Sequence, residues 1–260
     1  MKFAKAIIVT YTIEDKVILQ KPTKEGYTFY YWQNDDSRVG GITVGTTGDK
    51  AFNAVWLKHY NITCHLFGGE INKYNEIRPY YIITDKFYLG SPTKDGYTFD
   101  GWYYDENFNN KVNYNYFSNR SGGDVDLYAK FIPIEYKITY ELYGGTKHIS
   151  NPIKYTIEDE ILLSFATKDN YDFLGWFSDS GLQNRVIKIE KGTKGDITLY
   201  AKFTPTQYTI TYNLDNGENS PNNPTTYSLE SASVFLSNPT KKGYTFLGWY
   251  DKNTLALSSE

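Results

Sequence analysis

The sequence predicts a mainly β protein built from tandem modules of about seventy residues, each with at most one small helix. Three observations carry this expectation. Aromatic residues make up 18% of the 260 residues, and 26 residues are tyrosines, whose flat, bulky rings pack well on pleated strands. Short blocks alternate between apolar and polar residues, which is the pattern of half-buried strands. One aromatic motif recurs four times along the chain.

The recurring motif is a turn followed by tyrosine, phenylalanine and tryptophan. The spacings between successive tryptophans are 70, 74 and 73 residues. In three of the four copies a glycine stands directly before the tryptophan. The residues of this structural repeat motif are Gly26, Tyr27, Phe29, Trp32, Gly96, Tyr97, Phe99, Gly101, Trp102, Tyr171, Phe173, Gly175, Trp176, Gly243, Tyr244, Phe246, Gly248 and Trp249.

Two further blocks recur in constant order around this motif. One is the run from Tyr136 to Tyr140, matched by the runs that begin at Tyr60 and Tyr208. The other is Leu199-Tyr200-Ala201-Lys202-Phe203, matched at 127–131 and more loosely at 54–56. A period of this length suffices for a small independent core. The register predicts two complete modules flanked by one that lacks its first strand and one that lacks its last, with boundaries 1–57, 58–132, 133–205 and 206–260.

Each module after the first is expected to begin with an alternating strand. In the fourth module Tyr208, Ile210, Tyr212 and Leu214 would share one face of it. The glycine pairs 68–69 and 144–145, and the run 215–217, would then close turns that need positive φ. A second strand is expected as one run over 155–163, or 80–83 in the second module.

The tryptophan strand follows a Pro-Thr-Lys-x-Gly turn. Simple alternation predicts Tyr244, Phe246 and Gly248 on one face and Thr245, Leu247 and Trp249 on the other. A glycine inside a strand indicates a bulge or a close backbone approach. We interpret the glycine as leaving room for a neighbouring ring, so that the Trp–Gly pair is a packing device and not a ligand platform. The variable stretch 107–123 is expected to hold at most a short helix.

The joints between modules are short and contain proline. Only residues 204–207 separate Phe203 from Tyr208, and only residues 132–135 separate Phe131 from Tyr136. Proline stiffens such links, and four residues permit little excursion. The sequence therefore predicts modules arranged as an elongated, semi-rigid rod.

Composition argues against several classes of function. The 27 basic and 30 acidic side chains give a net charge of −3, which lacks the basic excess of a nucleic-acid binder. A single cysteine, Cys64, excludes an internal disulfide, and the three histidines occupy different places in the repeat. Acidic turns such as Asp35-Asp36 lack the terminal glutamate of a calcium loop. We expect no catalytic, cofactor-binding or metal residues.

The first nine residues are briefly apolar, and the apolar run breaks at Thr10-Tyr11-Thr12. That run is too short for a signal peptide or a membrane span. No membrane insertion is expected within this chain. For an exported protein, the signal and the anchor would lie outside it.

The motif set resembles the Listeria–Bacteroides repeat family, the B-repeat type of internalin B. The resemblance rests on motifs in constant order, including Pro239, Thr240, Lys241, Gly243, Tyr244, Phe246, Gly248, Trp249, Leu199, Tyr200, Ala201 and Phe203. It implies a β-grasp-like module whose first and last strands lie side by side and parallel, and an extracellular or cell-envelope location. It supplies no catalytic set.

This sequence departs from the family pattern at a few positions. Asn170 replaces a turn glycine, Ala166 a turn proline, and Tyr31 the glycine before a tryptophan. Cys64 occupies the strand position that Tyr140 and Tyr212 hold in other modules, where a buried apolar filler is the expected role.

The leading hypothesis for function is a non-enzymatic bacterial cell-surface or secreted repeat protein that acts as a stalk, spacer or adhesion array. The alternative is a module that binds a glycan or a host protein through exposed tyrosine and tryptophan, the partner being a host or surface protein or a glycan. An enzyme is disfavoured because no nucleophile, base and orienting group stand out. The incomplete end modules also permit weak head-to-tail self-association, although a fragment cut from a longer gene explains them more simply.

Overall fold

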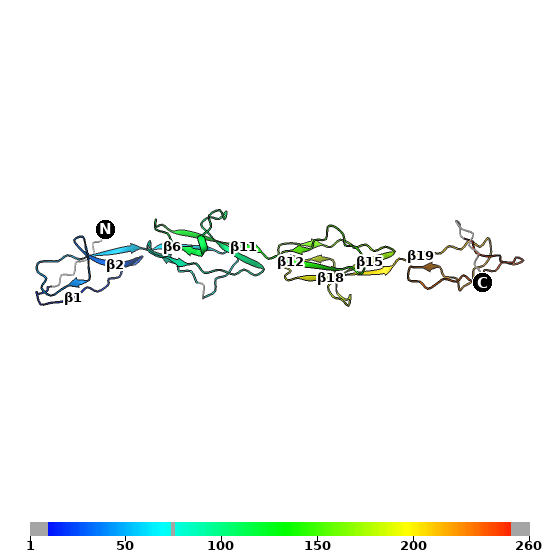
Figure 1. Cartoon of the computed structure of the whole chain (residues 1–260), viewed down its shortest axis with the longest axis horizontal. Helices are drawn as coiled ribbons and strands as arrows, with labels where there is room; N and C mark the ends of the chain where they lie inside the picture. The colour runs from blue at the N-terminus through cyan, green and yellow to red at the C-terminus, as the bar shows by residue number, and fades with distance from the viewer. Residues whose placement is uncertain (1–9, 74–75, 251–260) are drawn as a thin grey trace. The chain divides into compact units, whose positions relative to one another are not determined.

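The computed structural model describes residues 10–73 and 76–250 (Figure 1). The chain divides into two compact units, Met1–Pro133 and Ile134–Glu260, and each unit spans two of the predicted modules. Apart from the single-turn 3-10 helix η1 (Asn113–Asn115), the regular structure of the described residues consists of strands. The mainly β prediction is therefore confirmed, and the finer division into four modules stays a prediction.

The first unit contains a four-stranded sheet in the second module. Its strands are β6 (Tyr60–His65), β7 (Tyr80–Tyr81), β9 (Tyr97–Tyr103) and β11 (Val125–Pro133). Their order across the sheet is β7-β6-β11-β9. β11 pairs with β6 in parallel and with β9 antiparallel. The strand that comes last in the sequence therefore lies between the first strand and the tryptophan strand.

The second unit repeats this plan in the third module. Its strands are β12 (Tyr136–Glu141), β13 (Lys154–Tyr155), β15 (Tyr171–Phe177), β16 (Arg185–Val186) and β18 (Ile197–Pro205). They lie in the order β13-β12-β18-β15-β16, again with a parallel pair formed by the first and last strands. That pairing is the one implied by the family resemblance. The narrower β-grasp-like description stays a prediction.

The outer modules contribute smaller sheets. The first module has β2 (Tyr27–Asn34), β3 (Ser37–Val39) and β5 (Asn53–Lys58) in the order β3-β2-β5, and a separate pair β1 (Val17–Ile18) with β4 (Gly41–Ile42). In the fourth module β19 (Tyr208–Thr209) pairs with β20 (Thr226–Tyr227).

The prediction of one continuous second strand is wrong. A turn closed by the Asp159 N–H and the Thr156 carbonyl oxygen, 3.2 Å apart, separates β13 from β14 (Ile161–Leu162). β13 joins the main sheet, whereas β14 pairs with β17 (Lys188–Ile189). The second module does the same, because β8 (Phe87–Tyr88) pairs with β10 (Tyr116–Phe117) outside the main sheet.

A one-residue bulge interrupts every described pairing between a tryptophan strand and a last strand. The register shifts between Phe173 and Gly175 in β15, and at the equivalent places in β9 and β2. An extra residue reverses the alternation of all residues beyond it. Phenylalanine and tryptophan therefore lie on the same side, and the prediction that they face opposite ways is wrong.

The glycine before the tryptophan has a different role from the one expected. Gly175 adopts φ of +145°, and a Cβ there would lie 2.8 Å from the Arg185 side chain, not against a ring. In the third module the glycine that faces a ring is Gly145, where a Cβ would lie 2.7 Å from Cζ of Phe203. The predicted bulge beside this glycine is therefore confirmed, and the prediction that the glycine leaves room for a neighbouring ring is wrong.

Each complete module encloses its own buried cluster. In the second module Tyr81, Trp102, Phe117 and Leu127 are fully buried at its centre. In the third module Tyr155, Trp176, Ile189 and Leu199 take these places. Residues at the first and last strands contribute to each cluster, so the parallel pair is part of the wall of the core.

Candidate functional site

The phenylalanine–tryptophan contact of the repeat motif recurs in all four copies, although residues 244–250 of the fourth copy do not form a strand. The phenylalanine and tryptophan rings contact each other, with centroids 5.5, 5.8, 5.4 and 5.2 Å apart in successive modules. The turn lysine lies over the motif tyrosine, as Lys94 Nζ does 4.2 Å from the ring centre of Tyr97. Trp102 is 0% and Trp176 2% exposed. These two indoles fill the core and have no face open to a ligand.

The indole nitrogen ties the tryptophan strand to the chain before its turn. Trp102 donates to the carbonyl oxygen of Gly90 at 2.7 Å, and Trp176 to that of Ser164 at 2.8 Å. In the third module the side chain of Asn151 also pairs with Ser164, accepting its N–H at 2.8 Å and donating to its oxygen at 2.9 Å. Burying these polar groups costs little free energy, because each of them has a hydrogen-bond partner.

A second arrangement, which we call the Tyr–Gly–Asp latch, holds the start of the last strand. In the third module Tyr155 donates its hydroxyl to the carbonyl oxygen of Gly195 at 2.6 Å. The next residue, Asp196, accepts the backbone N–H of Lys137 through Oδ1 at 2.7 Å. Burial raises the pKa of the Tyr155 phenol, so the hydroxyl keeps the proton that it donates.

The second module has the same latch. Tyr81 donates to the carbonyl oxygen of Gly123 at 2.7 Å, and Asp124 accepts the backbone N–H of Asn61 at 2.7 Å. In the first module Tyr11 donates to the carbonyl oxygen of Gly48. The latch was not predicted from the sequence, although a Gly-Asp pair precedes the last strand at 48–49, 123–124 and 195–196 and is a signal for it.

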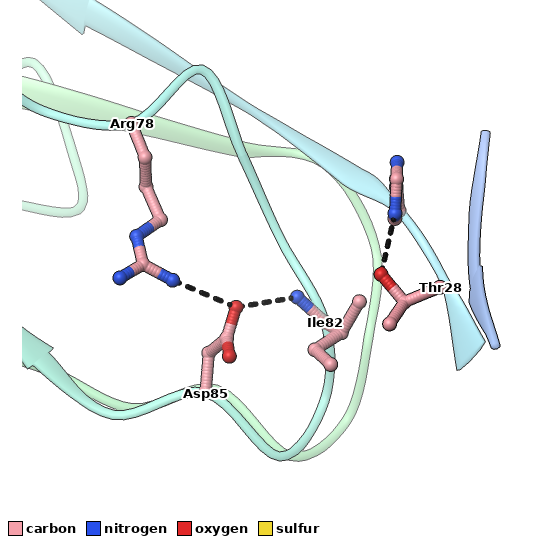
Figure 2. Close-up of polar contacts among 5 residues, drawn as sticks. Thr28, Arg78, Ile82 and Asp85 are labelled. Atoms are coloured by element: carbon pink, nitrogen blue, oxygen red, sulfur yellow. Dashed lines mark hydrogen bonds and ion pairs between the residues drawn. The ribbon is translucent and has the colours of Figure 1, made fainter. Parts of the chain in front are cut away.

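Within each unit, the joint between its two modules is held by hydrogen bonds to the turn before the tryptophan strand. Within the first unit, the N–H of His59 bonds to the carbonyl oxygen of Gly26 at 2.9 Å, and its Nε2 lies 2.8 Å from Oγ1 of Thr28 (Figure 2). The His59 ring stacks on Tyr80 at 4.0 Å. The joint residue thus contacts the modules on both sides of it.

The joint within the second unit uses the turn residue Asn170. Its carbonyl oxygen accepts the N–H of Thr206 at 2.9 Å, and its Oδ1 accepts the hydroxyl of Tyr208 at 2.9 Å. Asn170 has φ of +63°, a conformation that asparagine tolerates better than most residues. The substitution of asparagine for the usual glycine therefore keeps the turn and adds a contact across the joint.

Close to the first joint, Asp85 stabilises the turn after β7. It accepts the N–H of Ile82 at 3.0 Å and forms an ion pair with Arg78 at 3.2 Å (Figure 2). Both partners serve the turn, so this carboxylate is a structural group.

The second module carries a partly exposed group of rings, the aromatic row, made of His65, Phe67, Phe108 and Tyr128. The two members that lie in strands, His65 and Tyr128, alternate with core residues such as Cys64, so their side chains face away from the buried cluster. His65 stacks on Tyr128 at 4.4 Å, and Phe67, which is 53% exposed, lies 6.4 Å from the same ring. Asp126 contacts the His65 ring at 2.8 Å.

The described residues contain no group of three or more His, Cys, Asp or Glu side chains that could hold a metal ion. Cys64 packs against the core of the second module, and burial raises its pKa to about 11. A thiol in that state is a poor nucleophile at neutral pH. Within the residues the structure describes, none of the helices is both long and apolar enough to span a membrane.

The sequence pattern described as the Listeria-Bacteroides repeat domain matches residues 5–54, 60–130, 136–202 and 208–259. A "Putative Gly-rich membrane protein" of Evansella cellulosilytica is 27% identical over 250 residues, which are 92% of this chain and 27% of that protein. A "Putative membrane protein" of the same organism is 28% identical over 247 residues, 88% of this chain and 34% of the relative. "Internalin H" of Listeria monocytogenes is 33% identical over 131 residues, 50% of this chain and 21% of its own length. No solved structure matches the chain.

Proposed function

The chain belongs to the Listeria-Bacteroides repeat family, and on that premise we propose that it is a non-enzymatic spacer or stalk of a bacterial surface protein. Two relatives are named as membrane proteins and one as an internalin. These names support an extracellular or cell-envelope location. The chain spans about a third or less of the relatives' length, so the role of any larger protein is part of the proposal.

One observation carries the spacer role: a complete module takes the chain in at one end of its sheet and releases it at the other. β12 begins at Tyr136 and runs parallel to β18, which ends at Pro205. Because Ile138 lies beside Ile197, these two ends are separated by roughly 33 Å along the strands at about 3.3 Å per residue. An up-and-down hairpin would instead return the chain to its starting point.

Small-angle scattering of the whole chain tests this proposal. A compact chain of 260 residues would have a radius of gyration of about 18 Å. Four modules in line, each advancing the chain by roughly 33 Å, would give about twice that radius. A value near that of the compact chain would remove the spacer proposal and the division at 57, 132 and 205 with it.

Glycan binding is a second candidate, favoured by the aromatic row of the second module. Sugars stack on ring faces, and Asp126 and Lys130 stand in the same sheet region, Lys130 Nζ lying 5.5 Å from the Phe108 ring centre. Trp102 and Trp176 are buried, so tyrosine and phenylalanine would have to carry such a site. A glycan array with the parent chain and with Tyr128→Ala tests it. The candidate fails if nothing binds, or if binding survives that substitution.

A further inference from the structure

We propose that the complete modules are load-bearing elements, built to resist tension applied along the chain. The inference deepens the spacer role and rests on it for the direction in which force enters. It is carried by the parallel pairing of first and last strands and by the Tyr–Gly–Asp latch at the end where the tension arrives.

The strand arrangement sets how a pull is transmitted. Tension from the preceding module reaches β12 at Tyr136, and tension from the following module reaches β18 at Pro205. β12 and β18 are parallel neighbours (Figure 1), so the pull slides them in opposite directions along their own axes. Sliding stretches all the bonds of the ladder together, whereas a pull across the strands would open them one at a time.

The ladder is the same in both complete modules. Four residue pairs join β12 to β18, from Ile138 beside Ile197 to Glu141 beside Tyr200. Four pairs join β6 to β11, from Ile62 beside Val125 to His65 beside Tyr128. On its other side the last strand pairs with the tryptophan strand over six residue pairs in each module. The first strand is therefore the element that tension can pull out of the sheet. The hydrogen bonds of its parallel ladder must break for this to happen.

The latch lengthens this ladder at its loaded end. The Asp196 carboxylate bonds to the N–H of Lys137, one residue before the first paired residue of β12. A charged acceptor makes a hydrogen bond roughly twice as strong as a neutral one. The buried hydroxyl of Tyr155 fixes the carbonyl oxygen of Gly195 and so keeps Asp196 in place. Asp124 and Tyr81 do the same beside Asn61.

Single-molecule pulling on the whole chain, with Cys64→Ala to leave a single pair of engineered thiols, tests the inference. Handles at Glu135→Cys and Gln207→Cys load the third module by sliding. Handles at Glu135→Cys and Lys191→Cys load the same ladder by peeling, because residue 191 lies in the turn before β18. We expect a severalfold higher unfolding force in the sliding geometry. Equal forces in the two geometries would overturn the proposal.

The latch has a matched control within the same module. Asp196→Asn removes the charge from a carboxylate on the loaded ladder, while Asp179→Asn does so in the loop between β15 and β16, where Asp179 accepts the N–H of Asn184 at 2.7 Å. We expect Asp196→Asn to lower the sliding force and Asp179→Asn to leave it unchanged, even where both lower the stability to urea. The positioning role of Asp196 is wrong if both variants lower the force equally. Asp124→Asn and Asp105→Asn repeat the comparison in the second module.

These outcomes are separable from those of the spacer proposal. An extended chain whose modules unfold equally easily by sliding and by peeling would be a spacer without load-bearing modules. A compact particle whose third module still resists sliding would keep the mechanical property and lose the spacer role.

Discussion

The indole nitrogen of Trp176 donates to the carbonyl oxygen of Ser164 at 2.8 Å, whereas the equivalent nitrogen of Trp249 is buried without a hydrogen-bond partner among the described residues. The two tryptophans stand at the same place in the repeat. Trp176 is 2% exposed, whereas the side chain of Trp249 is only half-buried, so the two positions differ both in packing and in the indole hydrogen bond.

We expect Trp176→Phe to destabilise the third module by about 2–3 kcal/mol, through lost packing and the lost bond to Ser164. Trp249→Phe should cost at least about 1 kcal/mol less, because Trp249 is half-buried and its indole donor has no partner among the described residues. Urea titrations followed by hydrogen exchange in each module measure both changes. Equal costs would show that neither the indole bond nor the deeper burial of Trp176 adds to the stability of the third module.

Adjacent glycines in the third module must be glycine for different reasons. A Cβ at Gly145 would lie 2.8 Å from the Thr167 carbonyl oxygen, which is backbone and cannot easily move. Gly144 has open space around it and φ of +84°. We expect Gly145→Ala to cost about 2–3 kcal/mol by overpacking and Gly144→Ala about 1 kcal/mol by backbone strain.

Gly144→Asn is the control for that comparison, since Asn216 occupies the equivalent position of the fourth module with φ of +62°. Asparagine accepts this conformation, so the change should cost less than about 0.5 kcal/mol. Thermal unfolding of the three variants ranks them. A Gly144→Asn variant as unstable as Gly145→Ala would contradict the distinction.

Cys64 should react slowly with thiol reagents in the native chain. Burial raises its pKa from 9.0 to about 11, so at pH 8 on the order of a thousandth of it is thiolate. Unfolding in urea should speed the reaction on the order of a hundredfold by removing that shift. Labelling followed by mass spectrometry gives both rates, and equal rates would show that the thiol is not shielded.

Asp179 should make the third module sensitive to acid. The N–H groups of Asn184 and Gln183 lower its pKa below the usual 3.8 in the folded chain. A carboxyl whose folded-state pKa is depressed stabilises the fold above its unfolded pKa, and that stability is lost as the pH falls through the folded-state value. Asp179→Asn should therefore flatten the loss of stability between about pH 5 and pH 2. An unchanged slope would exclude this loop as a source of acid sensitivity.

Local patterns in the sequence predicted the features that depend on short stretches of chain. The alternation of Tyr60, Ile62 and Cys64, and the turn conformation at Asn170, follow from residue types alone. The faces of the tryptophan strand could not be predicted by counting, because the bulge at Leu174 exists only through pairing with β18. The faces of Phe173 and Trp176 are set by a strand more than twenty residues away.

The latch escaped prediction for a related reason. Gly195 and Asp196 look like an ordinary turn in the sequence, and their partners Tyr155 and Lys137 are brought to them only when the sheet forms. The available signal for the latch was that the Gly-Asp pair recurs before the last strand of the first three modules. Polar contacts between distant segments of this kind become visible from sequence only when the copies are compared position by position.

The central place of β18 bears on how such a chain is made. The strand synthesised last in the module fills the middle of the sheet, so β12 and β15 have no common partner until residues 197–205 have left the ribosome. Each module must therefore wait for its own end before it can fold, and folding advances along the nascent chain in whole modules. A chain that has to be threaded through a narrow channel gains from that delay, since the segment in transit stays open until its final strand arrives.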